Sequence, residues 1–210
     1  MAQINYSEDK KILKEVLGKS MTLYLPKEVE VIDTEAFSKV EFAQVYVQTS
    51  TKCEDFSMLC KAFRLILLYI EGTTIISRLP LSGVCGFEPY LKGRFPNYEG
   101  YDGCFRSVKD ERQKIDTAIS RLYYPYQLQP TYRQMYEKYL KQKYRVSIKQ
   151  VIEDGNAEIF HWLFSFKTPD IYMIREFKEV AVASHQSEIV LFLMSYEREH
   201  FAKKEENFEL

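Results

Sequence analysis

The sequence predicts an α+β repeat protein, in which a short solenoid of parallel strands is followed by an all-helical block. Two self-similarities predict this fold class. Three strand-like runs, MTLYLP at 21–26, AQVYVQ at 43–48 and LILLYIE at 65–71, have centres about 22 or 23 residues apart. In the last third of the chain, residues 148–165 can be laid over residues 178–195 with an offset of 30. Fixed spacing of this kind is typical of units that stack on their neighbours.

Length and composition fit a folded chain with a sizeable core. The 210 residues, 46% of them apolar, suit one domain or two small domains joined end to end. A net charge of -1, from 29 basic and 30 acidic residues, gives no overall reason to expect nucleic acid or an anionic membrane surface as partner. No run resembles a signal peptide or a membrane span, so we expect a cytoplasmic location, reduced cysteines and no membrane partner.

The first 20 residues are expected to form a capping helix. Ser7 is placed to be the N-cap of a helix over 7–17, and Gly18 to end it. Four apolar residues then share one helical face: Ile12, Leu13, Val16 and Leu17. Such a helix would shield the open end of the strand stack that follows.

The strand runs alternate between apolar residues that would enter a core and residues that would point outwards. Leu23 and Leu25, then Val45 and Val47, are expected on the inner side. Parallel stacking would then align three outward tyrosines in a ladder: Tyr24, Tyr46 and Tyr69. For the third run we favour a register with Leu68 and Ile70 inside, whereas a strict period of 22 would turn Leu67 and Tyr69 inwards.

The first unit, LYLPKEVEVIDTEAFSKV, resembles the bacterial leucine-rich repeats of the surface-antigen type, which run from a strand through Pro and a turn to an Ala-Phe pair. The second unit lacks the Pro, and the third has only Gly86-Phe87 at the Ala-Phe position. The resemblance implies a leucine-rich-repeat-like block over 21–87. It also implies a recognition surface, which is what most members of that family present.

Beyond this block the sequence predicts a loop or linker over 88–108, a helical block over 109–201 and a frayed tail over 202–210. Within the helical block, Glu158, Ile159 and Leu163 match Glu188, Ile189 and Leu193 at the offset of 30. These stretches resemble degenerate ankyrin-like helix pairs, although the Thr-Pro-Leu-His signature of ankyrin repeats is missing.

No residue pattern indicates catalysis, a cofactor or a metal. The three histidines, His161, His185 and His200, have neither the i, i+3 nor the i, i+4 spacing of a zinc site on a helix. Nucleophile, phosphate-loop and dinucleotide-binding motifs are absent from the sequence. We therefore expect a protein that is not an enzyme, and no cofactor.

One basic run offers an alternative function. It comprises Lys138, Lys141, Lys143, Arg145 and Lys149, with Tyr139 and Tyr144 among them. Basic residues interleaved with aromatic rings can grip single-stranded nucleic acid. The same cations are also favoured near a helix C-terminus, so the run has a purely structural interpretation as well.

The sequence therefore predicts a non-catalytic protein-protein interaction module of a bacterial cell, with an unidentified protein partner. The residues expected to bind this partner are Tyr24, Tyr46, Tyr69 and Gln44. Tyrosine suits this role because it offers a large apolar surface and a hydroxyl group at a low cost in conformational entropy. Two alternatives remain open: a phage or mobile-element inhibitor of a host complex, and a weak nucleic-acid binder that uses Lys138 to Lys149.

Overall fold

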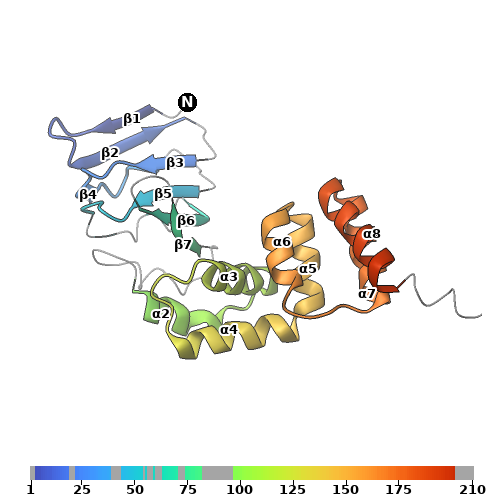
Figure 1. Ribbon diagram of the computed structural model, residues 1–210. Helices are drawn as coiled ribbons and strands as arrows, with labels where there is room; N and C mark the ends of the chain where they lie inside the picture. The colour runs from blue at the N-terminus through green and yellow to red at the C-terminus, as the bar shows by residue number, and fades with distance from the viewer. Residues whose placement is uncertain are drawn as a thin grey trace, which may run out of the picture. The chain divides into compact units, whose positions relative to one another are not determined.

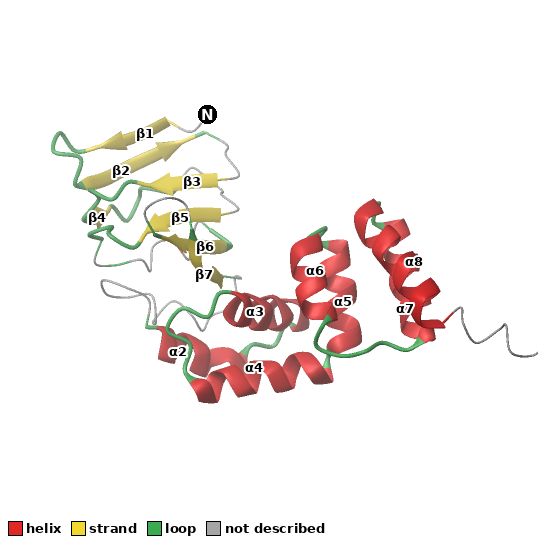
Figure 2. Ribbon diagram, viewed as in Figure 1, coloured by secondary structure: helices red, strands yellow, loops and turns green. Residues whose placement is uncertain are grey.

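The structure is a computed structural model, shown as a ribbon in Figure 1. It describes residues 3–18, 22–38, 44–53, 55, 59, 63–70, 74–81 and 97–201. The chain divides into two compact units, Met1–Glu137 and Lys138–Leu210. Two small mixed sheets come first along the chain, and helices follow them (Figure 2).

The first sheet has the order β1-β2-β4, formed by β1 (Gln3–Tyr6), β2 (Ile12–Leu17) and β4 (Val31–Ile32). β1 and β2 are antiparallel, whereas β2 and β4 are parallel. The capping helix expected over 7–17 is therefore wrong. Ser7 closes the β1–β2 turn instead of capping a helix, because its Oγ accepts a hydrogen bond of 2.9 Å from the Ile12 amide.

A β-bulge explains why this strand looks helical in the sequence. Asn5 pairs with Glu15 but the next residue, Tyr6, pairs with Leu13, so Lys14 is an extra residue in β2. A bulge puts two residues of one strand opposite one residue of its neighbour and shifts the side-chain alternation. As a result Leu13 and Val16, three residues apart, are both fully buried, and this spacing imitates a helical face.

The second sheet has the order β3-β5-β6-β7, formed by β3 (Thr22–Leu25), β5 (Gln44–Gln48), β6 (Leu65–Tyr69) and β7 (Ile75–Pro80). β3, β5 and β6 are parallel neighbours, but β7 is antiparallel to β6. The predicted fold class, a repeat solenoid, is therefore wrong. Only five residues separate β6 from β7, and a parallel crossover needs about a dozen or more, so the chain has to turn back.

The inner face of this sheet holds the core of the first unit. The side chains that this face buries are Leu23, Leu25, Val45, Val47, Ile66 and Leu68. Between β4 and β5, Ala36 and Phe37 are buried too, and the Phe37 ring meets the Phe63 ring edge-on at 5.2 Å. The register expected for the third run is half wrong, since Leu68 is inside but Ile70 lies beyond the strand and is exposed.

The helices of the first unit are α2 (Tyr98–Gly103), a 3-10 turn η2 (Cys104–Ser107), α3 (Glu111–Tyr123) and the greater part of α4 (Pro130–Gln142). The linker expected over 88–108 lies outside the described residues up to residue 96, as does Gly86-Phe87. From Tyr98 onwards this stretch is helical. Asn97 starts α2, because its Oδ1 accepts a hydrogen bond of 3.0 Å from the Gly100 amide.

The second unit contains two helical hairpins. The first is α5 (Tyr144–Glu153) with α6 (Ala157–Phe164), and the second is α7 (Ile171–Ala183) with α8 (Ser187–Phe201). Their turns match at the offset of 30, because Gly155 and His185 both have positive φ, +71° and +58°. The tail predicted over 202–210 lies outside the described residues.

These two turns allow a paired prediction about stability. At φ near +60° glycine is unstrained, whereas any other residue costs roughly 1–2 kcal/mol. We therefore expect Gly155→Ala to destabilise the second unit by about 1 kcal/mol or more through backbone strain, while the end of the flexible Gln186 side chain, 2.9 Å from the new Cβ, can move aside. His185→Gly is expected to stabilise it by up to about 1 kcal/mol. Urea unfolding followed by the fluorescence of Trp162 measures both, and equal signs for the two changes would contradict the expectation.

Candidate functional site

The tyrosine ladder, defined as Tyr24, Tyr46 and Tyr69, lies on the outer face of the second sheet. Tyr24 and Tyr46 are directly paired across β3 and β5, as the sequence predicts. Their rings stack with centroids 4.6 Å apart and an interplanar angle of 17°. Tyr24 stands on the terminal strand of its sheet and is 61% exposed. A large apolar ring is thus presented to solvent in a fixed orientation.

Tyr69, the third residue of the tyrosine ladder, is displaced from its expected place. Tyr69 is paired with Gln48, and Tyr46 is paired with Leu67, so β5 and β6 are related by an offset of 21 residues. The rings of Tyr46 and Tyr69 still meet, edge-on, with centroids 6.4 Å apart. The ladder therefore consists of one stacked pair and a tilted third ring, in place of three equally spaced rings.

Gln44, the fourth residue expected to bind a partner, lies at the start of β5 beside the ladder. Its Nε2 donates a hydrogen bond of 3.0 Å to Thr22 Oγ1 on β3. This bond links the two strands that carry Tyr24 and Tyr46. Gln44 therefore positions the stacked pair in addition to any contact that it makes itself.

Helix α3 covers the opposite end of the same sheet face. Arg78 on β7 donates hydrogen bonds to Asp116 Oδ1 and Ser120 Oγ on α3. Leu67, which shares the outer face with Tyr46, is only 4% exposed. The outer face is thus buried near β6 and β7, while the β3 end leaves Tyr24 exposed to solvent.

A buried ion pair joins α2, α3 and α4. Arg121 donates from Nε and Nη2 to the two carboxylate oxygens of Asp102, at 2.7 and 3.0 Å. Tyr136 Oη donates to the same carboxylate at 2.8 Å, and all three side chains are shielded from solvent. Burial and the neighbouring Asp102 carboxylate raise the pKa of Tyr136 far above its usual range. Because no solvent or substrate reaches the group, its role is to hold the three helices together.

No pattern in the sequence singles out this ion pair. Asp102 and Arg121 are 19 residues apart, and neither belongs to a motif with a fixed spacing. The sequence offers no local signal for it, because Arg121 lies in the last turn of a largely polar helix. A cation is favoured at that end of any helix, whether it is buried or exposed.

The basic run is partly neutralised in the second unit. Arg145 Nε and Lys149 Nζ, one turn apart on α5, both pair with the carboxylate of Glu176 on α7. The two bonds lower the pKa of Glu176, chiefly through Arg145, and so keep it negative. Two of the five cations therefore join helices, while Lys138 and Lys141 remain exposed on α4.

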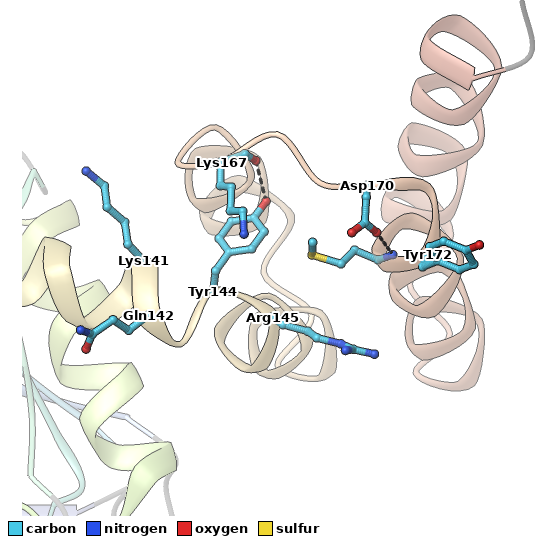
Figure 3. A pocket seen from close by; sticks show the side chains of 8 residues that line it. Lys141, Gln142, Tyr144, Arg145, Lys167, Asp170 and Tyr172 are labelled. Carbon is cyan, nitrogen blue, oxygen red and sulfur yellow. Dashed lines mark hydrogen bonds between the residues drawn. The ribbon is translucent and has the colours of Figure 1, made fainter. Parts of the chain in front are cut away.

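A shallow hollow of about 270 Å³ lies beside the basic run (Figure 3). It is lined by Lys141, Gln142, Tyr144, Arg145, Lys167, Asp170, Tyr172 and Met173. Tyr144 forms part of the wall of this hollow. Its ring is held in place because the Oη can donate a hydrogen bond to the carbonyl oxygens of Phe164 and Lys167, at 3.2 and 3.0 Å. Asp170 contributes a negative charge to the lining, and its Oδ1 accepts a hydrogen bond from the Met173 amide that starts α7.

The histidines do not come together. The His161 ring packs against Phe192, His200 stacks on Tyr196, and His185 forms the second hairpin turn. Among the described residues no group of three or more His, Cys, Asp or Glu side chains could hold a metal ion. Within the same residues no helix has the length and apolar character needed to cross a membrane.

Comparison with family models, with curated proteins and with solved structures finds no match for this chain. No relative therefore identifies it as a leucine-rich-repeat or ankyrin-like protein.

Proposed function

We propose that this chain is a non-catalytic module that binds a protein partner through the tyrosine ladder. One observation carries the proposal: the Tyr24 ring is exposed to solvent and is already stacked against the Tyr46 ring. Interface hot spots are enriched in tyrosine, and a ring that is held in place before binding loses little conformational entropy when the partner arrives.

The surroundings of the ladder favour a protein over a charged ligand. The outer face around Tyr24 carries Thr22, Gln44, Tyr46 and Gln48, all of them neutral. Aromatic rings with neutral polar neighbours are typical of protein interfaces, where charged residues are depleted at the centre. An inhibitor of a host complex, carried by a phage or a mobile element, would be a special case of this activity.

Tyr24→Ala tests the proposal with little damage to the fold. Tyr24 makes one ring stack, worth about 0.5–1.5 kcal/mol, whereas a hot-spot residue contributes about 2 kcal/mol or more to binding. We expect the variant to weaken capture of the partner from a bacterial lysate by roughly thirtyfold. The matched control is Tyr172→Ala, which removes another exposed tyrosine from the second unit.

Photo-crosslinking identifies the partner independently of affinity. A crosslinking amino acid at position 24 is expected to trap a protein that the same group at position 172 does not trap. Equal recovery of every partner by wild type, Tyr24→Ala and a triple alanine variant of the ladder would contradict a role for this surface.

The nucleic-acid alternative receives less support. Glu176 occupies Arg145 and Lys149, and Asp170 adds an acid to the lining of the neighbouring hollow. A mobility-shift measurement with labelled single-stranded RNA and DNA at low salt decides the matter, because phosphate contacts strengthen steeply as salt is lowered. A shift that Lys141→Glu abolishes would favour nucleic acid over the proposal above.

A further inference from the structure

The two hairpins of the second unit have the same local structure at the offset of 30. In the first turn the Gly155 amide donates a hydrogen bond of 3.0 Å to the Ile152 carbonyl oxygen, and in the second turn the His185 amide donates one of 3.1 Å to that of Val182. Two further pairs of backbone hydrogen bonds match in the same way: Asp154 to Gln150 with Ser184 to Val180, and Asn156 to Val151 with Gln186 to Ala181. Each residue of the first hairpin therefore has a structural counterpart in the second.

The second hairpin covers one apolar face of the first. Phe192 on α8 packs against two rings on α6, with centroids 4.5 Å from His161 and 5.1 Å from Phe164. Phe164 is buried, and Ile152 on α5 is completely buried. The cover of this face is thus a pair of helices joined by a short turn.

The same face of the second hairpin is exposed. Its apolar residues are Val182, Leu191 and Met194, which are the counterparts of Ile152, His161 and Phe164. They are 60%, 68% and 54% exposed. A helix face that stays in contact with water is expected to carry polar residues. The apolar residues at these positions therefore indicate a face that a further pair of helices can cover.

The charges beside this face specify what can lie on it. On the first hairpin Arg145 and Lys149, one turn apart on α5, both pair with Glu176 of the covering hairpin. Their counterparts on α7 are Arg175 and Glu179, and both are exposed. Because complementary charges select partners, a helix that covers this face is favoured if it carries an acid towards Arg175 and a base towards Glu179.

A second copy of this chain does not fit that description. In such a copy, the side of the second hairpin that carries Phe192 and Glu176 is already covered by the copy's own first hairpin. A further hairpin of the same sequence would also bring Glu176 towards Glu179, which has the same charge. Arg175 lies 3.7 Å from Glu197 on α8 but is 63% exposed, so its guanidinium can still donate to an acid of a partner.

We propose that a helical hairpin of another protein docks on Arg175, Glu179, Val182, Leu191 and Met194, which we call the open face. This hairpin lies on the second hairpin as the second hairpin lies on the first. It places a large apolar side chain over Leu191 and Met194, as Phe192 is placed over His161 and Phe164. The open face is separate from the tyrosine ladder, which belongs to the first unit, so failure of either proposal leaves the other unaffected.

A duplication tests whether the open face accepts a hairpin. A second copy of residues 165–194, inserted after Met194, adds a third hairpin at the offset of 30. Leu191→Cys in the original second hairpin reports exposure through the rate of thiol labelling, measured by mass spectrometry of the peptide that contains it. We expect labelling to be roughly tenfold slower than for the same substitution in the natural chain. Val146→Cys is the matched control, because Val146 is an exposed residue on α5 outside the open face, and its labelling should not change.

A charge change tests the polar part of the open face. In the duplicated chain, Glu179→Lys in the original second hairpin rebuilds the arrangement of Arg145 and Lys149 around the added Glu176. We expect it to slow labelling at position 191 by a further factor of roughly three. In the natural chain the same substitution should leave labelling at position 191 unchanged. An equal effect in both chains would exclude the charge assignment.

Circular dichroism of the duplicated chain shows whether the added helices form. If they form and labelling at position 191 is as fast as in the natural chain, the proposal is wrong. If they do not form, a photo-crosslinking amino acid at position 191 of the natural chain decides, with its adducts from a bacterial lysate mapped to single residues. Adducts on a helical hairpin that carries the acid and the base support the proposal. Adducts on a second copy of this chain, on a strand or on a loop, or no adducts, contradict it.

Discussion

Replacement of Asp102 by alanine is expected to destabilise the first unit by about 3–5 kcal/mol. The carboxylate accepts hydrogen bonds from Arg121 and Tyr136, and no side chain of this group is exposed. Its removal leaves the guanidinium buried and unpaired, and a buried unpaired charge costs far more than a lost surface ion pair. Urea unfolding followed by circular dichroism measures the change.

A triple substitution separates the charge from the cavity. Asp102→Leu with Arg121→Met and Tyr136→Phe replaces the ion pair, and the hydroxyl that donates to it, by apolar side chains, and such replacements are often neutral or stabilising. We expect this variant to regain most of the stability that Asp102→Ala loses. Equal losses for the two variants would mean that shape, and not the unpaired charge, decides the cost. Trp162 lies in the second unit, so its fluorescence shows whether that unit unfolds at an unchanged urea concentration.

Alternation along the strands predicted the parts of the fold that depend on local pattern. Leu23 and Val45 pair across β3 and β5 and are buried as expected, and so the stacked pair Tyr24 and Tyr46 was predicted too. A strand with one face buried has a strongly specified register. In β6 the residues Ile66, Leu67 and Leu68 are all buried, so alternation could not fix the register there.

The wrong or missing predictions all depend on contacts between residues that are far apart in the sequence. Leu13 and Val16 have a helical spacing in the sequence, and the bulge at Lys14, which exists only where β2 pairs with β1, lets a strand bury both. The solenoid was wrong because the short turn after Tyr69 sends β7 back antiparallel to β6. The pairing of Asp102 with Arg121 joins residues on different helices. The periodic spacing of apolar residues along the sequence contains no information about any of these contacts.

The core of the second unit depends on aromatic residues, and Phe160 is the residue on which we expect it to depend most. Phe160 is completely buried on α6, with ring centroids 5.5 Å from Phe164 and 5.7 Å from Phe192 on α8. Truncation of a buried phenylalanine typically costs about 3–5 kcal/mol, since apolar contacts are lost and a cavity remains. We therefore expect Phe160→Ala to destabilise the second unit by this amount, measured through the fluorescence of Trp162.

Tyr172→Ala is the control for this substitution, because its ring is exposed and its loss should change the stability by less than about 0.5 kcal/mol. A similar loss in both variants would contradict a core centred on Phe160. Helix α8 has two different faces, because Phe192 reaches the first hairpin from its inner side while Leu191 and Met194 are exposed on the other side. Phe160→Ala should loosen the contact between the two hairpins, whereas Leu191→Ala on the exposed side should leave the unfolding transition almost in place. The two variants thus distinguish the face of α8 that holds the hairpins together from its exposed face.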